Sequence, residues 1–186
     1  MDKYQRGYPK FSLCGLNCGL CPRFNTVGTS KCPGCGGEDF QNKHPSCAII
    51  SCSRKHESIQ FCCDCPEFPC SRYKDIPQKD SFITYKNVIS DFCKFRKNGI
   101  EIYKRDLDRK TDYLELLLTE YNDDRSKNFY CVAVNLLEID DVESIVERIV
   151  NEKAIKTFDK SRRAKYVKDL FLKVAGEKGI DLDLRK

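Results

Sequence analysis

Three short runs punctuate the first part of the chain: residues 14–22 read CGLNCGLCP, residues 32–36 read CPGCG and residues 62–70 read CCDCPEFPC. Each run contains two cysteines three positions apart, with glycine or proline beside them. Such a CxxC turn brings two sulfurs to one ion, and glycine or proline lets the chain turn tightly enough. These runs therefore predict a region organised around bound metal.

The compartment in which the protein resides decides whether its cysteines indicate disulfides or metal ligands. No run approaches the roughly 20 apolar residues of a membrane span, and residues 1–13 lack the apolar core of a secretory signal. We therefore expect a cytoplasmic protein with no membrane partner. Eleven of the 13 cysteines lie between positions 14 and 70. In a reducing compartment such a density indicates metal ligands, and an odd number cannot pair completely in disulfides.

Ten of these cysteines follow regular spacings and form the predicted ligand set. The pairs at 18–21 and 32–35 give CxxC-x10-CxxC, which suits one tetrahedral zinc ion. A second zinc site can draw on the run 62–70 together with Cys52 or Cys47. Two zinc ions need eight sulfurs. Cys14 and one of Cys47 and Cys52 therefore stay unassigned, unless there is a third site or a bridged cluster. The predicted ligands are Cys14, Cys18, Cys21, Cys32, Cys35, Cys47, Cys52, Cys62, Cys65 and Cys70.

The remaining cysteines and both histidines are interpreted differently. Cys63 interrupts a CxxC pair and is expected to be a bystander. Cys93 and Cys131 lie in apolar stretches and are expected to be buried core residues. His44 and His56 lie between the cysteine groups and are alternatives to a sulfur ligand, although sulfur is already abundant.

Zinc is the favoured metal, and an iron–sulfur cluster is the alternative cofactor. Zinc held by four sulfurs is structural, which predicts a zinc-binding scaffold or binding module. The spacing C-x3-C-x2-C at 14–21 is also the one that radical-SAM enzymes use, but too few residues follow for their barrel. The bacterial ferredoxin run is absent. Because clusters also accept four cysteines, a redox or sulfur-handling protein remains the alternative.

A change of composition divides the chain. All seven prolines lie at or before Pro77, and seven of the ten glycines lie at or before Gly37. We therefore predict a cysteine-rich metal-binding module over residues 10–77 and a helical region over 78–186, with the option of one shared core. The expected fold is mainly α with an irregular metal-knuckle region, a small α+β arrangement being the alternative.

Apolar side chains recur at helical spacing along the second region. One stripe is expected to break near Thr111. Asp140 or Asp141 is expected to cap the next helix, and Ser161 the last. Residues 129–137, FYCVAVNLL, are apolar without a clear period and leave helix and strand open. The four stripes run from Tyr85 to Cys93, Tyr103 to Tyr121, Val142 to Val150 and Tyr166 to Val174.

Charge and motifs restrict the function. Each four-thiolate zinc site carries −2, so two sites would lower the formal net charge from +5 to +1. Nucleic acid is therefore a less favoured partner than an unknown protein. There is no HExxH, Walker loop, GxSxG or dinucleotide fingerprint, so no reaction is assigned. Basic residues near aromatic ones keep the nucleic-acid alternative open: Arg23, Lys31, Lys43, Arg54, Lys55, Arg72 and Lys74.

The order CGLNCGLCP, CPGC and C-x4-C-x9-C-x2-C-x4-C, ending in CPEFPC, resembles the domain of unknown function 3795 family. These are small cysteine-rich proteins of bacteria and archaea. The resemblance covers residues 11–73, and Cys62 rather than Cys63 takes the family position. Residues 122–143 are similar to longer members, which have a glycine where Asp124 stands, so this loop is expected to differ. The resemblance implies metal binding and no known activity.

Overall fold

The computed structural model describes residues 4–44, 46–74 and 79–186, and within these ranges the protein is helical and has no β-strand. The predicted mainly α fold is confirmed. None of the described helices has both the length and the hydropathy needed to cross a bilayer. The second region comprises α4 (Val88–Asn98), α5 (Ile100–Glu120), α6 (Lys127–Leu136), α7 (Ile139–Asn151), the 3-10 helix η3 (Lys153–Thr157) and α8 (Lys160–Glu177).

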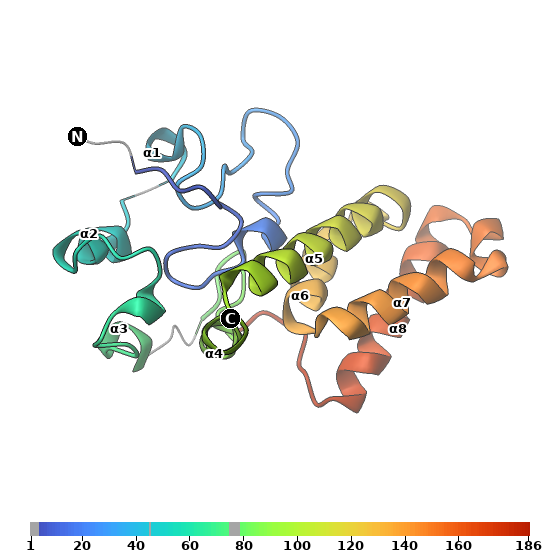
Figure 1. Cartoon of the computed structure of the whole chain (residues 1–186). Helices are drawn as coiled ribbons and strands as arrows, with labels where there is room; N and C mark the ends of the chain where they lie inside the picture. The colour runs from blue at the N-terminus through green and yellow to red at the C-terminus, as the bar shows by residue number, and fades with distance from the viewer. Residues whose placement is uncertain (1–3, 45, 75–78) are drawn as a thin grey trace.

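The cysteine-rich half lies on the left of Figure 1 and consists mostly of loops with short helical pieces. Its prolines and glycines interrupt every longer helix that might form. The predicted boundary between residues 77 and 78 lies outside the described residues. The helical pieces are η1 (Cys18–Leu20), α1 (Phe40–Lys43), α2 (Ala48–Lys55), η2 (Cys62–Asp64) and α3 (Ser71–Lys74).

Helix α5 forms the centre of the helical half, because α4, α6 and α7 all pack against it. Leu114 and Leu117 of α5 are completely buried. Helix α6 lies against α5, α8 and η1, and every side chain from Tyr130 to Asn135 is buried. Residues 129–136 are therefore helical, and Leu137 is the extended residue that ends the helix. A helix enclosed on several sides has no polar stripe, which is why its period alone did not distinguish helix from strand.

Two predicted details of the helical faces are wrong. Thr111 does not interrupt α5, because its buried hydroxyl donates to the Asp108 carbonyl within the helix at 2.7 Å. Cys93 is exposed, whereas the neighbouring Phe92 is completely buried. One residue rotates a helix by about 100°, enough to carry Cys93 off the buried face. Cys131 is buried, as predicted.

The predicted helix caps are also wrong, by two or three positions. Asp140 and Asp141 lie inside the first turn of α7, where carboxylates complement the helix dipole without capping it. Helix α8 begins earlier than predicted from Ser161. Its cap is Asp159, whose carboxylate accepts a hydrogen bond from the Arg162 amide at 2.9 Å.

The loop before α6 places Asp124 in the left-handed region, with φ of 68°. Glycine is the usual residue for this conformation, and aspartate tolerates it better than most others. Neighbouring bonds hold the turn: the Asp123 carboxylate accepts from the Arg125 amide at 3.1 Å and from the Ser126 hydroxyl at 2.5 Å. An aspartate thus occupies here a backbone conformation that usually favours glycine.

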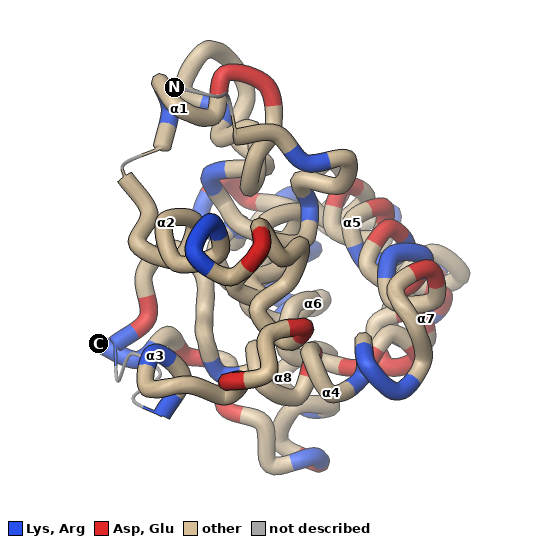
Figure 2. The backbone as a smooth tube through the Cα atoms, turned by 60° about the vertical axis from the view of Figure 1, so that its left-hand side comes forward, with Lys and Arg blue, Asp and Glu red and all other residues tan. Residues whose placement is uncertain are grey.

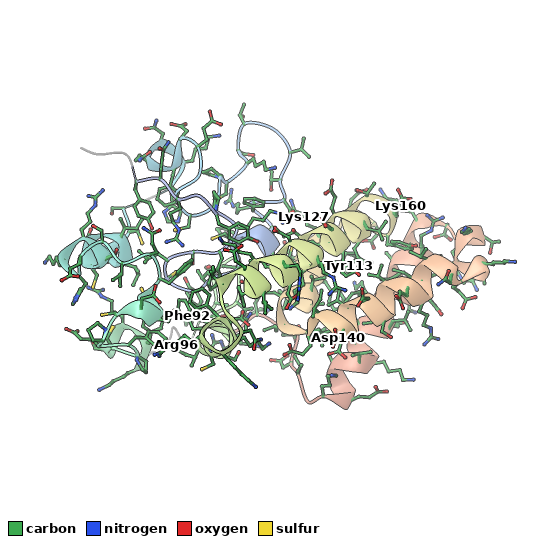
Figure 3. All side chains as sticks on the ribbon, viewed as in Figure 1. Phe92, Arg96, Tyr113, Lys127, Asp140 and Lys160 are labelled. Atoms are coloured by element: carbon green, nitrogen blue, oxygen red, sulfur yellow. The ribbon has the colours of Figure 1, made fainter. Side chains whose placement is uncertain are left out.

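Aromatic packing joins the two halves. Phe11, before the first cysteine run, is completely buried. Its ring centroid lies 5.6 Å from that of Phe92 on α4 and 4.7 Å from that of Tyr103 on α5. Figure 3 labels Phe92 where α4 borders the cysteine-rich half. The cysteine-rich half therefore rests on an apolar surface that α4 and α5 supply.

The C-terminal residues return to the start of the helical half. The buried Asp80 carboxylate accepts bonds from the Arg185 guanidinium at 2.9 Å and from the Tyr85 amide at 2.9 Å. Lys86 donates to the Asp181 carboxylate at 2.8 Å. The chain end is thereby fixed beside α4, as Figure 1 shows.

Candidate metal centre

Two of the CxxC pairs adopt the same local fold. In η1 the Cys21 amide donates to the Cys18 carbonyl at 3.0 Å, and in η2 the Cys65 amide donates to the Cys62 carbonyl at 3.1 Å. Each pair is thus a single 3-10 turn, in which side chains three residues apart lie on the same side. A proline follows the second cysteine of both turns and prevents the helix from continuing. The backbone therefore presents the two sulfurs of each pair together.

A small pocket, which we call the cysteine pocket, collects sulfurs from three elements of the cysteine-rich half. Its volume is about 20 Å³, close to that of a single small occupant. Phe68 and Tyr73 form an aromatic part of its wall. Figure 3 draws the sulfur atoms in yellow among α1, α2 and α3. The potential ligands lining the cysteine pocket are Cys52, His56, Cys62, Cys65 and Cys70.

His56 enters this pocket from the end of α2. Its Nδ1 lies 3.9 Å from the Cys65 sulfur. Two ligands of one tetrahedral zinc, at about 2.1 and 2.3 Å from it, would be roughly 3.6 Å apart. Cys52 precedes His56 by four residues, a spacing that places both on one side of a helix. That C-x3-H spacing is the signal in the sequence that could have favoured His56 as a metal ligand. His44, by contrast, stacks on Phe40, with ring centroids 4.6 Å apart.

The sulfurs of Cys14, Cys52 and Cys70 lie near Cys62 and affect its pKa. Burial is the main cause that raises the pKa of the Cys62 thiol to about 12; the three sulfurs also raise it, and the Tyr73 hydroxyl lowers it. Tyr73 also donates to the Cys14 carbonyl at 3.1 Å. A thiol in such surroundings ionises readily only when a cation compensates the crowded negative charge.

The earlier cysteines form a second group next to the pocket. Burial raises the pKa of the Cys18 thiol well above its usual value, and the nearby sulfurs of Cys35, Cys14 and Cys21 add to this. Cys47 in turn raises the pKa of Cys35. In this group, which we call the first sulfur group, Cys18 lies near Cys35 and Cys21 lies near Cys32, and the remaining members are Cys14 and Cys47.

Backbone amides partly offset the burial of these sulfurs. The amides of Arg23 and Phe24 lower the pKa of Cys21, and the Leu13 amide lowers that of Cys35. Hydrogen bonds to sulfur stabilise the thiolate, which is the form that binds metal. Backbone amides of the loops around the cysteines thus supply the donors that a sulfur–metal site requires.

The sulfurs are near one another but do not form a closed coordination shell. In the described parts of the chain, no three cysteine, histidine, aspartate or glutamate side chains converge closely enough to hold an ion as they stand. The donor chemistry of the cysteine pocket fits zinc, because it offers four thiols and one imidazole. The predicted ligand assignment therefore stays a prediction. Cys63 is buried in the core, and its sulfur contacts the Asp64 carboxylate at 3.8 Å.

A buried polar network fixes the first cysteine run to the helical half. The Asn17 amide donates to the Asp91 carboxylate and to the Asn135 side-chain oxygen, each at 2.8 Å. The Tyr103 hydroxyl donates to the Asn17 oxygen at 2.9 Å. Asn17, Asp91 and Asn135 are all buried. The network therefore ties η1 to α4, α5 and α6, and nothing in the sequence periodicity indicated these partners.

One comparison with known proteins gives a match. Residues 10–75 match the model of the family described as "Protein of unknown function (DUF3795)", which confirms the resemblance seen in the sequence. The matched segment contains all ten predicted metal ligands, from Cys14 to Cys70. No curated protein and no solved structure matches the chain.

Proposed function

We propose that the segment of residues 10–75, which matches the model of a family of unknown function, is a zinc-stabilised module that serves as a scaffold or binding surface. The observation that carries the proposal is the cysteine pocket, where four thiols from α2, η2 and the loop after η2 line one small cavity. Free thiols rarely gather in this way, because each loses hydration without gaining a strong partner.

In the cysteine pocket the zinc ligands would be sulfurs of α2, η2 and the following loop, with His56 placed to replace one of them. Zinc supplies folding free energy there when it is bound. Four protein ligands leave no position for water or substrate, so a closed site of this kind is structural. The proposed ligands are Cys52, Cys62, Cys65 and Cys70.

A second ion would belong to the first sulfur group. The amides that stabilise Cys21 and Cys35 support thiolates at this place. The group holds six sulfurs, more than one tetrahedral ion takes, so two members are expected to be replaceable. The second ion would link η1 to the loop of residues 32–36, and η1 already rests on α5 and α6.

Metal content of protein purified without oxygen tests the proposal. We expect about two zinc ions per chain, no iron and no visible absorption. Cys65→Ser should lose one zinc and Cys18→Ser the other, with a lower thermal midpoint in both. Cys93→Ser is the matched control, since this thiol is exposed on α4, and it should keep both ions.

Two outcomes would contradict the zinc assignment. Iron with acid-labile sulfide and a brown colour would replace zinc by an iron–sulfur cluster at the same cysteines. If Cys65→Ser kept two zinc ions and an unchanged thermal midpoint, the cysteine pocket would not be a metal site.

A further inference from the structure

The net positive charge of the chain comes from residues 153–168, which we call the basic segment. It contains seven lysines and arginines and one aspartate, a net charge of +6, so the other 170 residues together carry −1. The segment comprises η3 and the first half of α8. In Figure 1 these elements lie on the right, at the opposite end of the molecule from α1, α2 and α3. A local excess of this size indicates a polyanion as partner.

The cations of the basic segment are directed into solvent in matched pairs. Lys153 and Lys156 of η3 are exposed and three residues apart, a spacing that superimposes side chains in a 3-10 helix. Arg162 and Lys165 are exposed and share one side of α8. Figure 2 colours the backbone tube blue at lysine and arginine positions, over the whole of the described chain. Lys160, labelled in Figure 3, stands between the two pairs in the sequence and is also exposed.

Most of these charges have no counter-charge. Among residues 4–44, 46–74 and 79–186, no ion pair is formed by Lys153, Lys156 or Lys165. Lys160 pairs with Asp124 at 2.8 Å, where both side chains are largely exposed. Exposed pairs of this kind are weak, and a stronger anion can replace the carboxylate.

Part of the acidic charge of the neighbouring helix α7, which packs against α8, is neutralised by cations of other elements. Asp141 pairs with Lys178 at 2.8 Å and Glu143 with Arg109, whereas Asp140 and Glu147 form no ion pair among the described residues. Glu138, which precedes the helix, pairs with Lys94 at 2.6 Å. These pairs reduce the negative field that reaches the basic segment.

The basic segment is held in one arrangement by its own side chains. Ile155 of η3 is buried in the core. The Arg162 guanidinium lies 4.1 Å from the centroid of the Phe158 ring, and Arg163 donates to the carbonyls of Phe158 at 3.4 Å and Glu120 at 3.3 Å. These bonds fix the turn between η3 and α8 against the end of α5. The exposed cations are thereby preorganised, which lowers the entropy lost on binding.

We propose that the basic segment binds the phosphate backbone of a nucleic acid. Regularly spaced, unpaired cations match a repeating phosphate chain, and lysines and arginines make most such contacts. A lipid surface fits less well, because the apolar side of α8, with Val167 and Phe171, is buried in the protein core. Contacts to phosphate carry no sequence information, so binding is expected to be independent of sequence. The proposal does not depend on zinc.

Fluorescence anisotropy with the metal-loaded full chain tests it, using labelled single-stranded RNA and duplex DNA of about 20 units each across a salt series. The test variant is Lys153→Gln/Lys156→Gln/Lys165→Gln. We expect at least tenfold weaker binding than wild type and a log–log salt slope about 2 to 3 smaller, roughly one per lost phosphate contact. The thermal midpoint should stay unchanged because these side chains are exposed. A matched control removes the same charge from the cysteine-rich half: Lys43→Gln/Lys55→Gln/Lys74→Gln.

Each alternative outcome has a defined meaning. Equal losses in both triple variants would show that binding follows net charge alone, and would overturn the proposal. A larger loss in the control would place a nucleic-acid site beside the cysteines. Equal binding of a poly-glutamate chain, or binding only to phosphatidylserine vesicles, would replace nucleic acid by an acidic protein or a membrane. No binding to either nucleic acid at low salt would also overturn the proposal.

Discussion

The two halves of this chain are stabilised by different means. The helical half supplies most of the main core, where Leu117 and Tyr130 are completely buried. Among the residues that the structure describes, the cysteine-rich half adds a separate cluster of three buried apolar residues, Leu13, Phe40 and Ile50. So small a cluster does not offset the conformational entropy of a segment rich in loops. We therefore expect metal bound by sulfur to stabilise the fold of the cysteine-rich half, whereas apolar burial stabilises the helical half.

Removal of the proposed zinc ions should have the largest effect and should separate the two halves. A structural zinc site contributes on the order of 10 kcal/mol to folding, so a strong chelator is expected to unfold the elements α1 to α3. Helices α5 and α6 should persist, because their burial does not involve metal. Hydrogen exchange followed by mass spectrometry measures this as lost protection over residues 40–74 and retained protection over 107–136. Readdition of zinc should restore the protection, whereas a protected α2 without zinc would mean that something else holds this half.

Leu117→Ala should produce the reverse result. Leu117 is completely buried, and truncating such a leucine costs about 2 to 5 kcal/mol through lost apolar burial and the cavity left behind. Urea unfolding followed by circular dichroism should show this loss, while the zinc content stays at the wild-type value. Leu172→Ala is the control, because that side chain is 50% exposed and its truncation should change stability by less than about 0.5 kcal/mol. Loss of zinc in Leu117→Ala would show that the halves are not independent.

Asn17→Ala should weaken the attachment between the halves by about 2 kcal/mol, since it removes the buried bonds that Asn17 makes to Asp91 and Tyr103. Asp91 keeps its bond from the Asn87 amide at 2.5 Å, which limits the loss. The effect should appear in both halves at once: a lower urea midpoint for the helices and easier removal of zinc by chelator. Asn151→Ala, an exposed position at the end of α7, is the control. An effect restricted to one half would show that the network stabilises η1 or the helices alone.

The sequence predicted those parts of the molecule that rest on local pattern. In α7 the residues Val142, Ile145, Val146 and Ile149 recur at helical spacing and are all buried. The identity of α6 was left open, because a helix covered on several sides loses the polar stripe by which a helix is recognised. The helix starts were misplaced because residues of the capping type also occur inside the first turn: Asp140 and Asp141 in α7, and Ser161 in α8.

In the candidate site too, the sequence predicted the features set by local pattern and missed the contacts between distant residues. The CxxC turns were predictable, since the spacing itself dictates a tight turn. The partners of Asn17 were not, because Asp91 and Asn135 are 74 and 118 positions away and join it only after the helices have packed. His56 lies in the cysteine pocket because α2 ends there, which the cysteine spacing alone did not indicate.

The last predicted effect concerns the C-terminal attachment, and it depends on pH. Burial raises the pKa of Asp80, but the hydrogen bonds from Arg185 and the Tyr85 amide outweigh this and hold the pKa at about 2, below its usual 3.8. A carboxyl group whose pKa is lowered by folding stabilises the protein above its unfolded pKa. That stabilisation, about 2 kcal/mol, is lost as the pH falls from about 4 to 2.

Asp80→Asn should therefore lower the free energy of unfolding by about 2 kcal/mol at pH 7, and the difference from wild type should shrink between pH 4 and 2. Urea unfolding at several pH values measures this difference. Acid also releases zinc from thiolates, but it does so in both proteins, so the difference isolates Asp80. A difference that did not change with pH would assign the loss to packing rather than to charge. Because Asp80 fixes the chain end beside α4, the variant should leave zinc content unchanged, and any loss of zinc would mean that this attachment supports the cysteine-rich half as well.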